Sequence, residues 1–448
     1  MSLLFSAPTL ARYRACRFSV IALVAILLHA LALSPHADAV EAPLTLAQAQ
    51  HLALERSRQL AGQDHAVAAA RELAVAAGQL PDPVLKLGID NLPVSGSGRF
   101  SLGNDFMTMR RAGVMQEITR ADKRHLRAEK FEHMAQKTLA EKAVAQAAIA
   151  RDTALAWLDR YYAEARAGVI AEQEVQAKLE IQAAEGAYRG ARGNLAELFA
   201  ARSVLATLGD QASESERRIR TATLMLSRWI GPAAELPLAA APATDTIDPD
   251  RAKIADQLTH HPELAVLAKQ ENIAELDVQL AQADQRSDWT VEVALQQRGP
   301  AYSNMISLGV SIPLQWDQKN RQDRELSSRL ALLEQAKAER EEMLRAHLAE
   351  VQALLLEWDS NRERSTRYRH QLMPLAQQRM AATITSYQGG KASLADVLSA
   401  RRNEIDVRLR SLELEADTAR LWAQLNFLSP GEGAPAHSAL TINKAANE

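Results

Sequence analysis

The sequence of 448 residues has one cysteine, few aromatic residues, and little glycine or proline. Cys16 lies before an apolar run near the N-terminus, so the chain beyond that run can form no disulfide, thiolate metal site or cysteine nucleophile of its own. Aromatic residues make up only 4% of the chain, although 47% is hydrophobic, and alanine and leucine supply most of the apolar content. This composition indicates long helices, and it excludes a β-sandwich, a disulfide scaffold and a collagen-like repeat.

The sequence also lacks an excess of charge and the common catalytic motifs. Its 52 basic and 55 acidic residues give a net charge of −3, so there is no basic field and we expect no nucleic-acid partner. The HExxH motif, the P-loop, the GxSxG motif and the dinucleotide-binding glycine fingerprint are all absent. We therefore expect no enzymatic activity and no cofactor. An enzyme remains an alternative for which no catalytic residues are evident.

The N-terminus is typical of a secretory signal. Three arginines precede an almost unbroken apolar run at 18–33, and Ala37-Asp38-Ala39 supplies a small-x-small cleavage site. We therefore predict a signal peptide at 1–39. A single membrane anchor is the alternative, but the run is shorter than the roughly 20 residues that a spanning helix needs.

The sequence contains an internal duplication. The block from Tyr188 to Arg202 recurs from Tyr387 to Arg401 with a constant offset, and further matches occur in the same order in both halves. We predict a first repeat at 44–230 and a second at 251–428. A proline-rich linker at 231–250, expected to be extended and not helical, joins them, and a tail at 429–448 is expected to be disordered.

Each repeat is predicted to contain a helix, a β-hairpin and a long helical hairpin. The first helices are expected at 45–79 and 251–285. Period-two alternation predicts hairpins of strands about nine or ten residues long. These strands are expected near 85–90 with 112–118, and near 289–296 with 305–312. The helical hairpins are expected at 124–186 with 194–228, and at 321–386 with 393–426.

Alternation over this length suits a strand in a membrane barrel, with one face toward lipid and the other toward water. Four strands cannot close a barrel, whereas several copies of the chain can. The narrow apolar stripe of the long helices suits side-by-side packing in a wall wetted on both sides. We therefore predict a mainly α fold with a transmembrane β-barrel. An ordinary half-buried hairpin and a long soluble coiled coil remain alternatives.

Glycines mark the two turns of the helical hairpins. Gly190 in the first repeat and Gly389-Gly390 in the second fall where a long helix ends and its return begins. This places a set of polar side chains at the hairpin tips, far from the strands: Tyr188, Arg192, Tyr387, Lys391 and Asp396. Asp396 also lies in the first turn of a helix, where an acid interacts favourably with the helix dipole.

The histidines and methionines give little evidence of a metal site. His260-His261, His125 and His133 are interpreted as exposed side chains and not as ligands. Met107, Met109 and Met115 are candidate Cu(I) ligands because a thioether is a soft donor, but methionines also fill irregular space, which is the interpretation we favour. We therefore assign no metal site.

At this level of detail the sequence resembles the TolC-type outer-membrane efflux channels over nearly all of the mature chain. The resemblance depends on the duplicated order of elements, on Ser311-Ile312-Pro313-Leu314 at the end of a strand, and on Ser386-Tyr387, Gly390 and Asp396-Val397-Leu398 at the second tip. It implies a homotrimer with a twelve-stranded barrel in the lipid of the outer membrane and a long periplasmic α-helical barrel. It also implies two partners, an inner-membrane resistance-nodulation-division pump and a periplasmic adaptor that docks at the tips.

The resemblance also implies roles for individual tip residues. Tyr387 and Asp396 match the tyrosine and aspartate of the closed channel entrance. Ser399 stands where a second aspartate is expected, and Lys391 lies beside Ala392, where the family has an arginine. Contact with the adaptor is implied for the two turns, at Tyr188, Gly190, Arg192, Gly389 and Gly390.

Three segments resemble the heavy-metal-resistance subgroup, whose members serve pumps for Co/Zn/Cd or Cu/Ag. They are Leu80-Pro81-Asp82-Pro83, Asp90-Asn91-Leu92-Pro93 and the stretch from Asp105 to Arg111. The predicted function is a passive exit duct that exports heavy-metal cations from a Gram-negative cell. A periplasmic adaptor and a coiled-coil scaffold of an export system are the alternatives.

Overall fold

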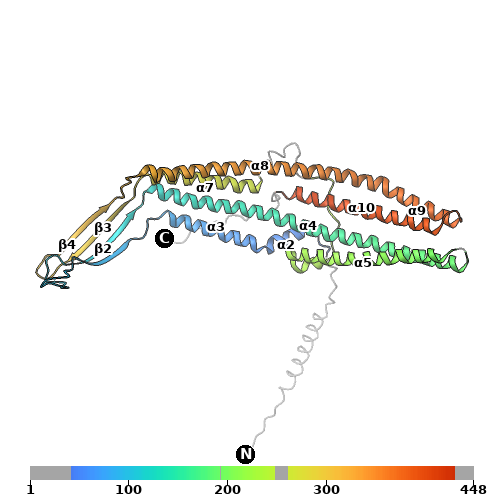
Figure 1. Ribbon diagram of the computed structural model, residues 1–448, viewed down its shortest axis with the longest axis horizontal. Coiled ribbons are helices and arrows are strands. Elements are labelled where there is room, and N and C mark those ends of the chain that lie inside the picture. Colours follow the sequence, from blue (N-terminus) through green and yellow to red (C-terminus); the bar gives the residue numbers. More distant parts are fainter. Residues whose placement is uncertain (1–41, 192, 248–260, 429–448) are drawn as a thin grey trace, which may run out of the picture.

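The computed structural model describes residues 42–191, 193–247 and 261–428. The molecule is strongly elongated, with a β-sheet at one end, two helical turns at the other, and long helices between them (Figure 1). The predicted signal peptide at 1–39, the predicted tail at 429–448 and the tip residue Arg192 lie outside the described residues.

The described part of the first half begins with two helices where the sequence predicted one. Its elements are α2 (Leu46–Arg56), α3 (Arg58–Ala77), β1 (Val84–Asp90), β2 (Met109–Ile118), α4 (Ala121–Arg189), α5 (Leu195–Ile230) and the 3-10 helix η1 (Gly231–Glu235). The single helix predicted at 45–79 was wrong at Ser57, whose backbone is extended and whose hydroxyl accepts a hydrogen bond from the N–H of Leu60. Ser57 therefore ends α2 and caps α3.

The second half follows a similar order, and the part of the helix predicted at 251–285 that precedes His261 lies outside the described residues. Its elements are α7 (Pro262–Asp284), β3 (Trp289–Gln297), β4 (Met305–Ser311), the short turn η2 (Gln318–Asn320), α8 (Gln322–Arg367), the π-helical turn η3 (Tyr368–Leu372), α9 (Met373–Gln388) and α10 (Leu394–Asn426). The helix predicted at 321–386 is not uniform, because η3 widens it just before Pro374. Proline has no N–H to bond the carbonyl of His370 and its ring crowds that carbonyl, so a wider turn is expected there.

The two predicted β-hairpins form one antiparallel sheet in the order β1-β2-β3-β4. The hairpins are joined by pairing of β2 with β3, from Arg110 opposite Gln297 to Ile118 opposite Trp289. Strands β1 and β4 have seven residues each, fewer than the sequence predicted, and they form the two open edges.

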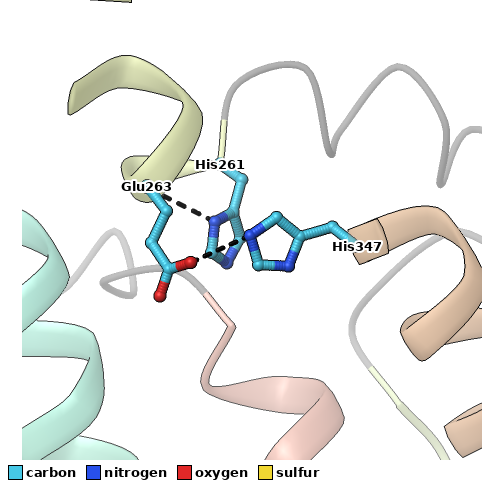
Figure 2. A group of neighbouring side chains, drawn as sticks. All are labelled: His261, Glu263 and His347. Atoms are coloured by element: carbon cyan, nitrogen blue, oxygen red, sulfur yellow. Dashed lines mark hydrogen bonds and ion pairs between the residues drawn. The ribbon is translucent and has the colours of Figure 1, made fainter. Parts of the chain in front are cut away.

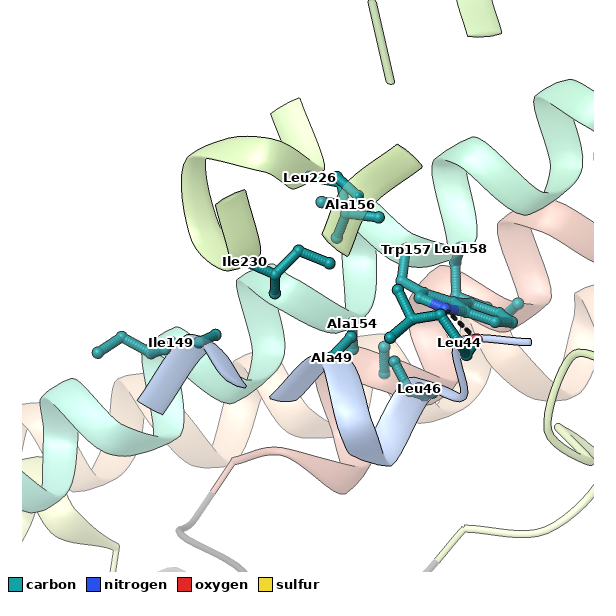
Figure 3. Close-up of a cluster of buried hydrophobic side chains, with 14 of the residues drawn as sticks. Leu44, Leu46, Ala49, Ile149, Ala154, Ala156, Trp157, Leu158, Leu226 and Ile230 are labelled. Atoms are coloured by element: carbon teal, nitrogen blue, oxygen red, sulfur yellow. Dashed lines mark hydrogen bonds between the residues drawn. The ribbon is translucent and has the colours of Figure 1, made fainter. Parts of the chain in front are cut away.

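The largest buried cluster lies midway along the molecule, around Trp157 on α4 (Figure 3). The indole Nε1 of Trp157 donates a 3.2 Å hydrogen bond to the carbonyl oxygen of Leu44, and Leu44 forms a parallel bridge with Leu238. The start of the described chain and the linker are thus held together beside α4. The linker was predicted to be extended, but η1 makes its first residues helical.

Away from this cluster the helices bury few side chains. Helix α8, 46 residues long, buries only Ala336, Val351, Trp358, Asn361 and Ser365. Large apolar side chains such as Leu356 and Leu375 are 73% and 60% exposed. The helical part is therefore a thin wall and not a globular bundle.

No helix within the described ranges is both long and apolar enough to cross a membrane.

Candidate functional site

One face of the sheet is apolar and exposed. Directly opposed residues form rows across all four strands, since opposed side chains in a sheet lie on the same face. One row consists of Leu85, Val114, Val293 and Leu308, which are 65%, 49%, 48% and 80% exposed. The next row consists of Leu87, Ala112, Leu295 and Ile306. No other described part of the chain covers this apolar face.

The opposite face of the sheet carries charge and small residues. Glu292 on β3 pairs with Lys86 on β1, with 3.0 Å between Oε2 and Nζ, and also forms an ion pair with Arg111 on β2. Gly113 lies against Ala294, where an added Cβ would come within 2.8 Å of the alanine Cβ. The sheet thus has one face suited to a hydrocarbon environment and one suited to water, as the alternation predicted.

The turns of the two helical hairpins lie at the end of the molecule farthest from the sheet (Figure 1). Gly390 has φ +72°, and the N–H groups of Gly390 and Lys391 bond the carbonyls of Tyr387 and Ser386. In the first turn Gly190 has an ordinary negative φ and Ala191 takes the left-handed position with φ 56°. Gly190 therefore lies in the first turn, as predicted, but the left-handed residue of that turn is Ala191 and not the glycine.

The two tip tyrosines have different surroundings. Tyr188 is 47% exposed, whereas Tyr387 is half-buried and packs against a cluster that includes Met380 and Leu398. Although the two tyrosines align between the repeats, only Tyr387 is packed against one of the buried clusters of the described residues. Tyr387 is thus the better-positioned candidate for a constriction.

Asp396 is fully exposed and is engaged in capping α10. The backbone N–H and the hydroxyl of Ser393 donate to its Oδ2 at 2.9 and 2.7 Å, and these hydrogen bonds hold the pKa of Asp396 below its usual value. Lys391 is exposed on the same turn. Asn194 and Glu197 form the matching capping box on α5. Asp396 therefore keeps a negative charge at the tip while it stabilises the helix start.

Ser399 lies in a groove between α5 and α10. The groove has a volume of about 670 Å³, and its lining also includes Ala395, Arg402 and Asp406 on α10 and Thr207 on α5. Ser399 is exposed and follows Asp396 by three residues in the first turns of α10, so it lies close to the tip that carries Tyr387. The structure thus brings these three predicted site residues to the same end of α9 and α10.

A series of ion pairs joins the two helical hairpins, and no sequence pattern predicted it. Three arginines of α10 reach acids on α4 in the pairs Arg401 with Glu180, Arg408 with Glu172 and Arg420 with Asp159. Charged residues are abundant on both helices, and only the packing of α4 against α10 selects these partners.

The three methionine candidates do not form one site. Met109 and Met115 lie on the charged face of the sheet but are separated by six residues of β2, which is roughly 20 Å along a strand. Met107 lies in the preceding loop and is 46% exposed. The expectation that they are not a metal site stays a prediction.

One histidine expectation was wrong. His261 is only 7% exposed and lies against Glu263 and His347 (Figure 2). Burial, followed by the nearby His347, lowers the pKa of His261 and favours its neutral form. The sequence could not reveal this cluster, because His347 is far along the chain on α8. His125 is exposed, as expected, His133 is half-buried, and His260 lies outside the described residues.

No protein-family model matches the chain, and no curated protein sequence matches it significantly. Solved structures do. The outer-membrane channel OprN is 16% identical with a TM-score of 0.73, and the match covers 86% of this chain and 90% of OprN. The outer membrane protein VceC from Vibrio cholerae is 18% identical with a TM-score of 0.71, over 86% and 96% of the two chains. CusC, whose structures concern folding and transmembrane channel formation, is 16% identical with a TM-score of 0.74, and the match covers 86% of this chain and 92% of CusC.

The chain has the fold of the outer-membrane channels. The predicted resemblance to the TolC-type channels is thus confirmed at the level of the fold. In this channel fold, the sheet with its two unlike faces and the tips with Tyr387 and Asp396 lie at opposite ends of one molecule (Figure 1).

Proposed function

We propose that the chain is the outer-membrane exit duct of a tripartite resistance-nodulation-division efflux system and works as a homotrimer. The observation that carries the proposal is the exposed apolar row Leu85-Val114-Val293-Leu308 on one face of a sheet whose other face is charged. Lipid on one side and a water-filled lumen on the other account for this pattern. The duct is passive, and no catalysis is assigned to it.

The open edges of the sheet support assembly from several copies. Strands β1 and β4 leave unpaired backbone groups, which cannot be left bare in a hydrocarbon layer. Three copies of a four-stranded sheet supply twelve strands, enough for a closed barrel. The exposed Leu356 and Leu375 on the long helices would likewise be covered by neighbouring copies.

The tips are the proposed point of contact with a periplasmic adaptor, and through it with the pump in the inner membrane. Tyr387 and Asp396 are proposed to narrow the channel entrance. Heavy-metal cations are the proposed substrates, supported by the resemblance of the stretch from Asp105 to Arg111 to the heavy-metal subgroup and by the fold shared with CusC. The proposed location is the outer membrane, with a large periplasmic portion.

Cell fractionation with a pair of adjacent substitutions tests the membrane role. Leu308→Arg places a charge on the apolar face, which costs roughly 2–4 kcal/mol at the middle of a bilayer. Ser307→Arg, one residue away, places it on the opposite face. We expect the native chain and Ser307→Arg to be detergent-requiring trimers in the outer-membrane fraction, and Leu308→Arg to be depleted from it. A soluble monomer of the native chain in the periplasm would instead favour an adaptor or scaffold.

Single-channel recording tests the entrance. We expect Tyr387→Phe combined with Asp396→Ala to increase the conductance, because both substitutions loosen the second tip. The matched control is Tyr188→Phe with Glu197→Ala, which makes the same kind of change at the first tip. Equal conductance of the native chain and the Tyr387/Asp396 variant would count against this entrance.

The sensitivity of a deletion strain to metals tests the substrate. We expect reduced growth on Cu/Ag or on Co/Zn/Cd salts, restored by the native chain and not by Leu308→Arg. Unchanged growth on all of these metals would contradict a heavy-metal substrate while leaving the exit duct intact.

A further inference from the structure

We propose that His261, Glu263 and His347 form a binding site for one zinc-class divalent metal ion that links the start of α7 to the middle of α8. The proposal goes beyond the exit duct, since a passive channel needs no resident metal. It concerns the helical part of the molecule and is independent of the methionines near the sheet.

The three side chains converge from two helices that are distant in sequence (Figure 2). One ligand atom of each residue lies within 4.8 Å of those of the other two. Nε2 of His347 is 2.9 Å from Oε2 of Glu263, and the two imidazole rings are 4.6 Å apart between centroids. Tetrahedral zinc, with bonds of about 2.0–2.1 Å, holds its ligand atoms about 3.4 Å apart. Small side-chain rotations therefore suffice to enclose an ion.

The environment of His347 favours a ligand over an ordinary ion pair. Its side chain is 12% exposed, and its buried Nε2 has no hydrogen-bond partner of acceptable geometry although the carboxylate of Glu263 is close. A buried nitrogen without a hydrogen-bond partner destabilises a folded protein, so its presence requires an explanation. A metal ion between the nitrogen and the carboxylate oxygen would satisfy both, because it attracts both lone pairs.

Local structure places His261 at the start of α7 before any ion binds. Its Nδ1 accepts the N–H of Glu263 at 3.3 Å, which makes it the N-cap of α7, and Pro262 sets the first turn of the helix. That hydrogen bond is long, so its loss on metal binding costs little. Glu263 follows in the same first turn, so two of the three ligands are placed by local structure alone.

The donor set selects the class of metal. Two imidazole nitrogens and one carboxylate oxygen suit Zn²⁺, Ni²⁺ or Cu²⁺, whereas soft Cu(I) prefers sulfur and Mg²⁺ or Ca²⁺ prefer oxygen alone. Three protein ligands leave a fourth position on zinc open to water. Glu350, whose carboxylate lies 3.8 Å from Nδ1 of His347, is placed to hold the outer nitrogen of that ring.

Equilibrium dialysis against Zn²⁺ tests the site. The full chain, purified in detergent and stripped with a chelator, is dialysed near neutral pH, and bound zinc is measured by mass spectrometry. We expect the native chain to bind one zinc ion per chain. Both His347→Gln and Glu263→Gln should lower the affinity for zinc by about 100-fold or more. Loading with Co²⁺ should give the visible absorption of a tetrahedral ion in the native chain and not in the variants.

His125→Gln is the matched control. His125 also pairs with a glutamate, at 3.7 Å from Glu129, but its side chain is 79% exposed, and among the described residues no third ligand adjoins the pair. We expect this variant to bind zinc as the native chain does. Circular dichroism of each variant checks folding, and Glu263→Gln, which keeps the size of the side chain, provides a second variant if His347→Gln fails to fold. Equal zinc binding by the native chain and Glu263→Gln, or an equal loss in His125→Gln, would overturn the proposal.

Discussion

Arg401 on α10 donates from Nε to Oε1 of Glu180 on α4 at 3.0 Å, and the two side chains are only 11% and 12% exposed. The same guanidinium bonds Glu404 on its own helix through Nη1, also at 3.0 Å. This ion pair is more buried than Arg408 with Glu172 or Arg420 with Asp159. Of the three contacts that join the helical hairpins, it is therefore the one whose Coulombic attraction is least screened by water.

Removal of the Arg401 charge should destabilise the protein strongly. Arg401→Gln leaves Glu180 and Glu404 without their cation, and breaking a buried pair from one side costs roughly 3–5 kcal/mol. Thermal unfolding followed by circular dichroism in detergent measures the effect. Arg345→Gln, at an ion pair in which both side chains are 68% exposed, is the control and should change little. Equal melting temperatures for the two variants would contradict the importance of the buried pair.

Replacement of Ala191 by glycine should stabilise the first tip. Ala191 has φ 56°, a left-handed conformation that costs an L-residue roughly 1–2 kcal/mol, and its counterpart in the second tip is Gly390 with φ +72°. Ala191→Gly is therefore expected to raise the free energy of unfolding by about 1 kcal/mol. Ala187→Gly, inside α4, should lower it by a similar amount. A loss of stability in Ala191→Gly would show that this turn is not strained.

Replacement of Gly231 by alanine should be destabilising for two separable reasons. Gly231 has φ 66° and ψ −139°, which only glycine adopts readily, and an added Cβ would lie 2.7 Å from the guanidinium of Arg56. Gly231→Ala is expected to cost about 1–3 kcal/mol from backbone strain alone. Adding Arg56→Ala should remove the steric part and leave the strain, so full restoration of stability by the double variant would be inconsistent with the observed backbone.

The stability of the helical part should fall at high pH because of Tyr162. Burial, followed by the charge of Glu415, raises the pKa of Tyr162 from 10.0 to about 12. A raised pKa means that the unfolded chain loses its proton first, so this contribution is present below pH 10 and is lost as the pH rises toward 12. Thermal unfolding between pH 9 and about pH 12 should show a smaller decline in Tyr162→Phe than in the native chain. Tyr188→Phe, which alters an exposed tyrosine, should leave the decline unchanged.

The order of elements was predictable because it depends on local patterns. Period-two alternation from Trp289 onward predicted the strands, and the capping residues Asn194 and Ser393 begin helices where the sequence placed them. The break at Ser57 was missed because its neighbours, among them Glu55 and Gln59, are good helix formers that conceal a single serine cap. The widened turn before Pro374 was missed because a helix can continue through a proline when neighbouring turns adjust.

The candidate site at the tips likewise has features that the sequence predicted and features that it did not. The tip positions of Tyr387 and Asp396 follow from sequence, because glycine and a capping acid mark a helical turn wherever it lies. The partial burial of Tyr387 and the exposure of Tyr188 do not follow, because the two tyrosines occupy the same position in aligned blocks and their burial depends on packing around residues such as Met380.

The sequence by itself determined the duplication, the long alanine-rich helices and the alternating strands, since each of these is a periodicity along one chain. Only the tertiary structure decided which distant residues meet: β2 with β3, Arg401 with Glu180, and His261 with His347. Charged and histidine side chains occur all along these helices, so their partners depend on the register and rotation of packed helices. Those are fixed by contacts between segments and not by any local pattern.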